Sequence, residues 1–563
     1  MNTRTVDGAP SSSVAALRAV APEHQAVAAG FSDEEAVEGL AITEEVRALF
    51  QRPAAASSAV AGPMAQSLEL LSVVPPELLS IIVSQLEIRA LACLAATCRL
   101  LWCDTPTPPP ALPTPGLVET ELRRRAEARG LHVGSSLTEG ALPWVPYLLK
   151  RDVYDALRRQ APLAVGDNHS LFVDRERRLH LACRREDIRA GWVGEPLLGH
   201  DWGSATGAST VSVPFTLVSS MQDERIVSVA SGSPRGGHSH CLALRAEGEV
   251  YSWGDGTDGA LVHADGSERA APRRIEALTH VENIAAGVLT SAAVDDRGRL
   301  FTWGCATFEE GKPTGLGYEL DPATEFQLLP KRVDALSEDR VAGVALGHGF
   351  TLAVTDAGAV FSFGESVYGA LGHGLSTSEV LPRRIQTLAE TGRRFVAVAA
   401  GEYHAMALTE EGHVYGWGDG IANGHGHDQH TPQLVTALAG EPVQLVYAGN
   451  ISSCAVAGKG ELYTWGCGFS FNLGHRVATI HPTPKRVEAL SRVKVAAAAV
   501  GESHTLVAGE DGVVWGFGQR AVLGLGEADA PPGDSEDEDS EDEIWGCVLQ
   551  PTPIPNLRVR TLP

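Results

Sequence analysis

The 563-residue chain is 44% hydrophobic and 20% charged, a composition that supports a large buried core and excludes wholesale disorder. Seventy acidic residues against 45 basic ones give a formal net charge of −25, which opposes binding to a nucleic-acid backbone. No stretch approaches the ~18 consecutive apolar residues of a membrane helix, and the nine cysteines fit neither a disulfide framework nor paired CxxC zinc ligands. We therefore expect a protein of the cytoplasm, the nucleus or both, with no metal or other cofactor, no direct nucleic-acid partner and no membrane insertion.

Residues 1–66 are dominated by Ala, Val, Ser and Pro, and they lack the large side chains whose burial offsets the ordering entropy of a chain. Acidic residues occur early in this region, unlike the Arg-rich, acid-poor composition of a transit peptide. No block of Lys and Arg forms a basic arm. We predict a disordered N-terminal region.

Residues 67–104 have apolar side chains at helical spacing. Pro75 and Pro76 precede the first such pattern, and Pro is favoured just inside the start of a helix. A second pattern runs from Leu91 to Trp102. Two short amphipathic helices cannot cover each other's apolar faces, so we expect another domain or another chain to bury them.

The segment VPPELLSIIVSQLEIRALACLAATCRLLW resembles the F-box, a motif that docks on the adaptor subunit of Skp–cullin–F-box ubiquitin ligases. The resemblance implies that the adaptor would contact two prolines and four apolar residues of the first helix, which are Pro75, Pro76, Leu78, Leu79, Ile82 and Leu86. The alternative is that these residues form the core of a helical cap on the following domain. Residues 105–162, a Pro-rich spacer and two further helical patterns, are predicted to be a connector.

From residue 163 to the C-terminus the sequence repeats itself. A motif of Gly, two variable residues, a His, Thr, Phe or Ser, and an apolar run recurs seven times, and six copies carry further glycines eleven and seventeen residues after the first. The first glycines are Gly166, Gly237, Gly287, Gly347, Gly401, Gly449 and Gly501. The second are Gly248, Gly298, Gly358, Gly412, Gly460 and Gly512, and the third are Gly254, Gly304, Gly364, Gly418, Gly466 and Gly518.

These fixed intervals predict a β-hairpin in each copy. In one copy, His404–Leu408 and His413–Trp417 flank the turn Thr409–Gly412, where Gly supplies the positive φ that a short loop requires. The residue before the third Gly is Trp or Phe in all six copies, and we predict that it is a buried wedge between neighbouring units. Units of this size cannot bury both of their own faces, so seven of them are expected to close into a ring.

The repeats, such as GEYHAMALTEEGHVYGWGDG, closely resemble those of the regulator-of-chromosome-condensation family. The resemblance implies a mainly β fold, a seven-bladed β-propeller over residues 163–563, with an acidic disordered insertion at 527–543. The first copy departs from the pattern, because Arg177 and Cys183 stand where the second and third glycines should be. Ser535 and Ser540 in the insertion each have an acidic residue three positions later, so they are candidate phosphorylation sites for acidophilic kinases.

Members of this family include exchange factors for small GTPases, ultraviolet-B photoreceptors and recognition modules. The photoreceptor branch has Trp after the first Gly, whereas here that position holds Asp167, His238, Val288, His348, Glu402, Asn450 and Glu502. Exchange factors pair an acidic face and a wedge loop with a basic tail, which residues 1–66 do not supply. The stretch Cys305–Pro330 is either a protruding loop or an ordinary insertion, and loop acids such as Asp255, Glu309 and Glu365 either suit a basic partner or only keep the surface soluble.

Four histidines, His169, His240, His404 and His504, recur at one repeat position. We predict that each makes a side-chain-to-backbone hydrogen bond that seals adjacent blades, because no Ser-His-Asp order, P-loop or dinucleotide fingerprint accompanies them. Our leading hypothesis is a non-enzymatic substrate receptor, in which the F-box-like helices bind a Skp-type adaptor and the propeller binds the protein to be ubiquitylated. The alternative is an exchange factor or regulator of a small GTPase, or a general scaffold.

Overall fold

A computed structural model describes residues 161–184, 212–232, 239–256, 259–262, 269–307, 312–321, 324–525 and 546–559. The chain divides into two compact units, Met1–Val153 and Tyr154–Pro563, and all described residues belong to the second. The predictions for residues 1–160, including the six F-box-like residues from Pro75 to Leu86, lie outside the described residues, as do Gly237, Ser535 and Ser540. Among the described residues, no helix is long and apolar enough to cross a membrane.

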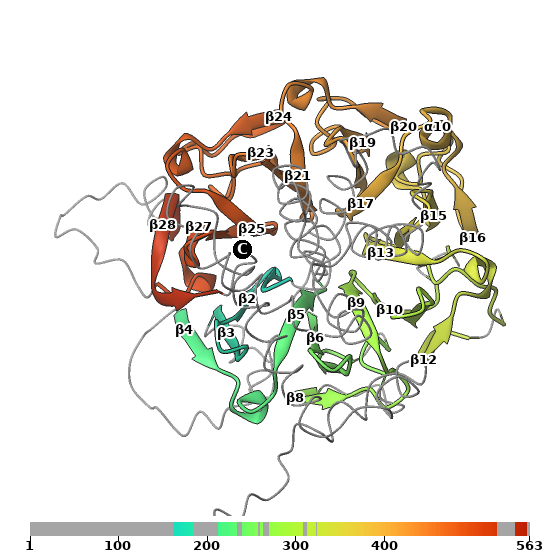
Figure 1. The fold of residues 1–563 in the computed structure, drawn as a ribbon, viewed down its shortest axis with the longest axis horizontal. Helices are drawn as coiled ribbons and strands as arrows, with labels where there is room; N and C mark the ends of the chain where they lie inside the picture. Colours follow the sequence, from blue (N-terminus) through green and yellow to red (C-terminus); the bar gives the residue numbers. More distant parts are fainter. Residues whose placement is uncertain are drawn as a thin grey trace, which may run out of the picture. The chain divides into compact units, whose positions relative to one another are not determined.

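Tyr154–Pro563 forms seven four-stranded antiparallel sheets arranged as blades around a central axis (Figure 1). In every blade the four strands pair in sequence order, and the first strand is the innermost. The predicted mainly β fold, a seven-bladed propeller, is confirmed.

The strands of blades 1 to 4 are listed here in chain order. Blade 1 consists of β1 Leu163–Val165, β2 His169–Val173, β3 Leu179–Arg184 and β4 Ser212–Leu217; blade 2 of β5 Ile226–Ser231, β6 His240–Arg245, β7 Val250–Gly254 and β8 Arg269–Arg274. Blade 3 consists of β9 Val281–Ala286, β10 Thr290–Asp295, β11 Leu300–Cys305 and β12 Phe326–Arg332; blade 4 of β13 Val341–Leu346, β14 Phe350–Thr355, β15 Val360–Gly364 and β16 Glu379–Arg384.

Blades 5 to 7 follow the same plan. Blade 5 consists of β17 Phe395–Ala400, β18 His404–Thr409, β19 Val414–Gly418 and β20 Gln429–Leu434; blade 6 of β21 Val443–Ala448, β22 Ser452–Ala457, β23 Leu462–Cys467 and β24 Ile480–Arg486; blade 7 of β25 Val495–Val500, β26 His504–Gly509, β27 Val513–Gln519 and β28 Cys547–Arg558. The short helices are η2 Ser219–Met221, η4 Asp334–Leu336, η5 Val367–Gly369, α10 Gln386–Glu390, η6 Thr436–Leu438, η7 Glu488–Leu490 and η8 Arg520–Val522.

The predicted hairpin joins the second and third strands of each blade. In blade 5, β18 and β19 pair from His404↔Gly418 to Leu408↔Val414, and Gly412 has a φ of +90° in the turn. The equivalent residue of blade 1 is Arg177, which adopts a φ of +66° although it has a side chain. Each sequence motif therefore begins after the innermost strand of its blade, since Gly401 directly follows β17.

The predicted wedges lie between blades. The aromatic residues before the third glycines are fully buried, and they are Trp253, Trp303, Phe363, Trp417, Trp465 and Phe517. Three of the indoles donate a hydrogen bond to a carbonyl of the preceding blade: Trp303 Nε1 to Ala260 O at 2.8 Å, Trp417 Nε1 to Ala370 O at 2.7 Å and Trp465 Nε1 to Ala422 O at 2.8 Å. The wedge thus fixes the angle between neighbouring blades as well as burying apolar area.

The ring closes between blades 7 and 1. Each of these blades is built from one continuous segment, so no strand is exchanged across the closure. Leu163 and Phe172 of blade 1 pack into a cluster with Leu506 and Ile554 of blade 7. An isolated antiparallel bridge joins Asp174 to Val559 near the end of the described chain. Side-chain packing and local hydrogen bonds therefore hold the first and last blades together.

The outermost strand of each blade is an edge that could pair with another chain. All seven of these strands place a proline where their register shifts, namely Pro214, Pro272, Pro330, Pro382, Pro432, Pro484 and Pro551. Proline has no N–H to offer to an incoming strand, and such bulges twist an edge away from pairing. The ring therefore protects its rim against edge-to-edge aggregation.

Candidate functional site

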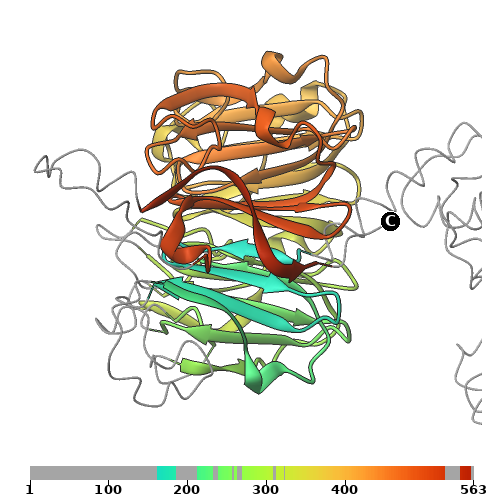
Figure 2. The same cartoon turned by 90° about the vertical axis from the view of Figure 1, so that its left-hand side faces the viewer.

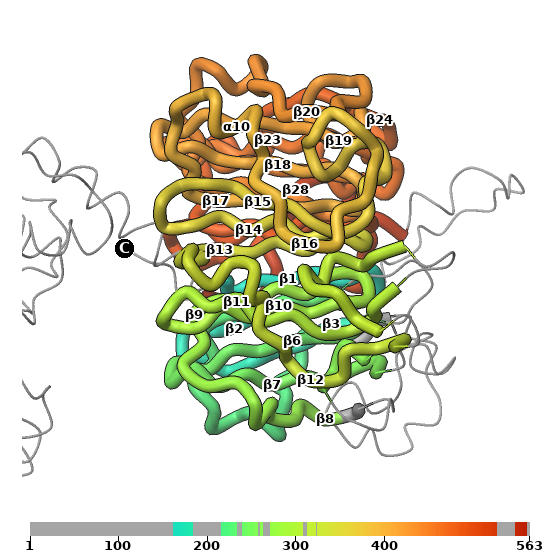
Figure 3. Tube along the Cα trace, turned by 90° about the vertical axis from the view of Figure 1, so that its right-hand side faces the viewer, coloured from blue at the N-terminus to red at the C-terminus, as the bar shows by residue number. Residues whose placement is uncertain are grey.

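The antiparallel blades give the ring two different faces (Figures 2 and 3). The turns between the second and third strands and the connections from one blade to the next emerge on one side, which we call the short-loop face. The connections from first to second strand and from third to fourth strand emerge on the other side, the long-loop face. The third-to-fourth connections span residues 185–211, 255–268, 306–325, 365–378, 419–428, 468–479 and 520–546.

On the short-loop face, buried apolar side chains and ion pairs hold the connections between blades in place. Each connection between blades carries a Val or Ile followed three residues later by a Leu or Met, and both side chains are buried: Val218 and Met221, Ile275 and Leu278, Val333 and Leu336, Ile385 and Leu388, Val435 and Leu438, and Val487 and Leu490. Among the described residues, most ion pairs also lie here, such as Arg299 with Asp295 and Arg340 with Asp356. All loops of this face are described, and none of them exposes a large hydrophobic side chain.

The exposed large hydrophobic side chains are found on the opposite side and on the rim. Within the part of the chain that the structure describes, Tyr368, Leu375, Phe469 and Val477 lie in third-to-fourth connections, Ile480 begins β24, and Leu329, Val380 and Leu381 lie on the outer strands β12 and β16. Leu375 is 64% exposed and Phe469 is 62% exposed. Apolar side chains held in water in this way are typical of interaction surfaces.

Tyr368 is the most unusual of these residues. It adopts a φ of +51°, a left-handed conformation that is costly for an aromatic residue, and its side chain is nevertheless 47% exposed. Its ring contacts Tyr403 edge-on at 5.7 Å between centroids, and Tyr403 in turn contacts His348 at 5.2 Å. The three side chains form a row that runs outward from the centre of the propeller. We call His348, Tyr403 and Tyr368 the aromatic row. Backbone strain that presents an exposed aromatic side chain is typical of a functional surface.

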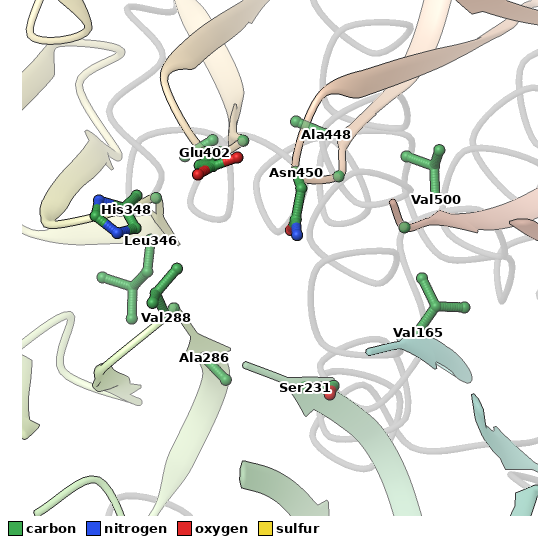
Figure 4. A pocket seen from close by; sticks show the side chains of 16 residues that line it. Val165, Ser231, Ala286, Val288, Leu346, His348, Glu402, Ala448, Asn450 and Val500 are labelled. Carbon is green, nitrogen blue, oxygen red and sulfur yellow. The ribbon is translucent and has the colours of Figure 1, made fainter. Parts of the chain in front are cut away.

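The inner end of the aromatic row reaches the mouth of the central channel (Figure 4). A cavity of about 80 Å³ is lined here by ends of innermost strands, including Val165, Leu346 and Val500, and by the residues that follow them, including His348 and Glu402. Cβ atoms would not fit at the glycines between these residues: a Cβ on Gly401 would lie 2.4 Å from Gly449 O of the next blade. Close packing of backbones therefore keeps this end of the channel narrow.

Three carboxylates surround the channel mouth. Asp167, Glu402 and Glu502 come from blades 1, 5 and 7, and each follows the first glycine of its repeat. Asn450 Nδ2 donates to Asp167 Oδ1 at 3.2 Å and to Glu502 Oε2 at 3.0 Å. Glu402 N donates to Asn450 O at 2.8 Å, which ties the neighbouring turns together. A neutral amide thus links two of the carboxylates without neutralising their charge.

Comparison with known proteins agrees with this geometry. The family model for the RCC1-like domain matches residues 148–499. The chain belongs to the RCC1-like domain family. The human E3 ubiquitin-protein ligase HERC2 is 39% identical over 308 residues, which are 53% of this chain and 6% of HERC2. The ultraviolet-B receptor UVR8 of Arabidopsis thaliana is 34% identical over 299 residues, which are 52% of this chain and 66% of UVR8.

Solved structures show the same fold. Prp20p of Saccharomyces cerevisiae has a TM-score of 0.53 and 20% identity, covering 76% of this chain and 91% of Prp20p. Human WBSCR16 has a TM-score of 0.50 and 21% identity, covering 62% of this chain and 86% of that one. The curated relatives match over less than two thirds of their own length, so the family membership of this chain concerns its RCC1-like propeller.

The recurring histidines do seal adjacent blades of the RCC1-like propeller, but the prediction of a backbone partner was wrong. His240, His404 and His504 place Nε2 within 2.7–2.9 Å of a serine hydroxyl on the second strand of the next blade, namely Ser291, Ser453 and Ser170. Each hydroxyl donates its proton to a carbonyl of the histidine's own blade, which are Ala260 O, Ala422 O and Val522 O. The ring nitrogen must therefore donate to the hydroxyl oxygen, because a serine has a single proton.

Blade 1 varies this arrangement. Cys241 occupies the position of the serine in blade 2, and His169 Nε2 lies 2.8 Å from Ser231 Oγ of β5 and 3.2 Å from Cys241 Sγ. Burial lowers the pKa of His169 and of His240 to about 4, and that of His404 to about 3. His169, His240 and His404 are therefore neutral at neutral pH.

In the structure, the first glycine of the second repeat is Gly232 and not Gly237, as the sequence pattern had indicated. Gly232 N donates to His240 O at 2.9 Å, the bond that Gly401 N makes to His404 O, so Gly232 occupies the structural position for which the sequence pattern had chosen Gly237. The connection from β5 to β6 spans residues 232–239, so it is five residues longer than the three-residue turns of the other blades. Spacing alone could not reveal this, because Gly237 also stands three residues before His240.

The loop acids singled out in the sequence have different environments. Glu365 is buried, and its Oε1 lies 3.1 Å from Lys312 Nζ, so this carboxylate already has a cation beside it. Asp255 directly follows β7 on the long-loop face, and Glu309 lies outside the described residues. Phe326–Pro330, the end of the stretch considered as a loop, belongs to β12. Among the described residues, no cluster of three or more His, Cys, Asp or Glu side chains is placed to hold a metal ion.

Proposed function

We propose that this protein is a non-enzymatic substrate receptor of a Skp–cullin–F-box-type ubiquitin ligase, in which the long-loop face binds the protein to be ubiquitylated. The observation that carries the proposal is the segregation of exposed large hydrophobic side chains, which are absent from the fully described loops of the short-loop face. A soluble domain keeps such side chains in water where a partner will cover them. A propeller is a scaffold, so its function depends on the faces and loops of this particular chain.

The adaptor-binding half of the proposal depends on the order of the segments. The F-box-like pattern at 67–104 precedes the connector at 105–162 and the propeller, which is the layout of a receptor with a docking motif at one end and a recognition domain at the other. HERC2, one of the relatives, is named as a ubiquitin ligase, and this supports a link between such propellers and ubiquitin transfer.

The test is a binding assay of the full chain with a purified Skp-type adaptor from the same source. We expect the wild type to bind and Leu79→Arg to lose binding, because burying a Leu side chain contributes roughly 1.5–3 kcal/mol and a charge at that position opposes burial. Leu79→Met is the matched control and should retain binding, since it preserves an apolar side chain of similar volume. The melting temperature of the propeller should be equal in all three proteins.

One combination of results would replace the proposal. If the wild type does not bind the adaptor and Leu79→Arg lowers the melting temperature of the propeller, the helical segment is a cap rather than a docking motif. A nucleotide-exchange assay on a small GTPase would then be the next measurement, because Prp20p, which shares the fold, was described together with its binding to Gsp1p.

A further inference from the structure

We propose that the partner of the long-loop face presents a Lys or Arg side chain beside apolar side chains, with the cation at the channel mouth and the apolar groups on the aromatic row and Leu375. This inference rests on the proposed function, since it assigns the chemistry of the segment that the long-loop face recognises. The bound partner is a segment of another protein. Its charge and hydrophobicity follow from two adjoining surfaces of the long-loop face, one apolar and one acidic.

The apolar surface is preorganised by its own backbone. The connection 365–378 carries both Tyr368 and Leu375, and Gly374 N donates to His430 O of blade 5 at 2.8 Å. Ser366 Oγ also donates to Leu375 O at 3.3 Å. The loop is thus fastened across two blades at the position where it exposes these side chains. A fixed aromatic side chain next to an exposed Leu is the kind of anchor that dominates protein interfaces.

The adjoining surface is acidic. Carboxylates on the described connections of the long-loop face are Asp167, Asp255, Glu319, Asp321, Glu325, Glu365, Glu402, Asp419, Asp428 and Glu502, against the cations Lys312, Arg476 and Arg520. Charge complementarity therefore favours a cationic partner and disfavours an acidic one.

The two surfaces meet within one turn. Glu402 lies at the channel mouth and the next residue, Tyr403, is the middle ring of the aromatic row. A cation bound near Glu402 and Glu502 would consequently lie beside the apolar groups that contact Tyr368. This adjacency indicates a mixed basic and apolar segment, because a purely basic chain would leave the aromatic row in water and a purely apolar one would not complement the acidic side chains of this face.

The test uses a library of random 16-residue peptides displayed on phage and selected against the immobilised full chain. We expect the enriched peptides to contain Lys or Arg adjacent to aromatic or aliphatic residues. Synthetic copies should bind in a fluorescence-anisotropy titration, and their affinity should fall as the salt concentration rises. Enrichment of acidic or uncharged peptides that still require the long-loop face would overturn this inference while leaving protein recognition by that face intact.

Four variants locate the binding. Tyr368→Gly removes the exposed ring from a backbone that Gly adopts readily, and Glu502→Gln removes a charge while keeping an acceptor for Asn450. Each should weaken the selected peptides about tenfold. Leu329→Ser on the rim and Glu488→Gln on the short-loop face are matched controls that should leave affinity unchanged, because both side chains are exposed away from the site. Selection of no peptide, or of peptides insensitive to Tyr368→Gly and Glu502→Gln, would reject the inference and also the assignment of the long-loop face as the recognition surface.

Discussion

The short-loop and long-loop faces are built by the same seven blades, yet they differ in where their large hydrophobic side chains lie. These side chains are buried on the short-loop face, and several are exposed on the long-loop face. The short-loop face repeats one design, with paired apolar anchors turned inward and carboxylates beside arginines. The long-loop face differs from blade to blade and keeps Tyr368, Leu375 and Phe469 in water. Repeated segments thus make the scaffold, and the side chains that vary from loop to loop are those to which we assign recognition in our proposal.

The largest expected effect is on the free energy of unfolding, and it comes from the buried histidines at the contacts between neighbouring blades, which we call the seams. Unfolded histidines titrate near 6.5, whereas His169 and His240 have folded pKa values of about 4. Between these values the unfolded chain binds more protons, so the free energy of unfolding should fall as the pH drops from 6.5 to 4, by about 1.4 kcal/mol per pH unit for each histidine. Urea denaturation measured from pH 7 to pH 4.5 would show the slope.

A natural seam provides the control for this prediction. Between blades 4 and 5, Phe350 occupies the histidine position and Ala405 the serine position. Phe350 packs over Gly347 in the same way as His404 packs over Gly401. In both cases a Cβ added to the glycine would lie 2.1 Å from the aromatic or imidazole ring. The double variant His404→Phe with Ser453→Ala should therefore fold and show a shallower acid slope. An unchanged slope would mean that other groups cause the loss of stability.

A smaller loss of stability is expected on the short-loop face. Asp295 is buried, accepts hydrogen bonds from Arg297 N and Arg299 N, and pairs with the Arg299 side chain. Asp295→Ala should lower the free energy of unfolding by about 2–3 kcal/mol while leaving peptide binding unchanged. Asp334→Asn is the control, since this side chain is 82% exposed beside Arg332 and should change stability by less than about 0.5 kcal/mol. Peptide binding lost in Asp295→Ala would contradict the division between the faces.

The smallest effect on stability is expected at the aromatic row. Whether the free energy of unfolding rises or falls there distinguishes a recognition residue from a structural one. Tyr368→Gly removes a left-handed aromatic residue, so the free energy of unfolding should stay the same or rise by up to about 1 kcal/mol. Thermal denaturation and the anisotropy titration on the same preparation would compare stability with affinity. A clear loss of stability would identify Tyr368 as a structural residue and remove it from the recognition surface.

The fold could be predicted from the sequence because the glycine and tryptophan intervals repeat with the geometry of the hairpin. The histidine positions could also be predicted, but their serine partners lie about 50 or more than 300 residues away, and only the closed ring brings them together. Tyr368 carried no signal, since its strained φ is invisible in the sequence. The carboxylates at the channel mouth were visible as residues after a glycine, yet their convergence depends on ring closure.

Because every blade is one uninterrupted stretch of chain, the order of synthesis matches the order of assembly. A blade can complete the backbone hydrogen bonds within its own sheet once its fourth strand has left the ribosome, without waiting for a strand from the far end of the protein. The contacts that join blade 7 to blade 1, such as those of His504 with Ser170 and of Asp174 with Val559, must wait for the last blade. Until then the growing molecule is an open arc, and the prolines on its outer strands already protect it from pairing with other nascent chains.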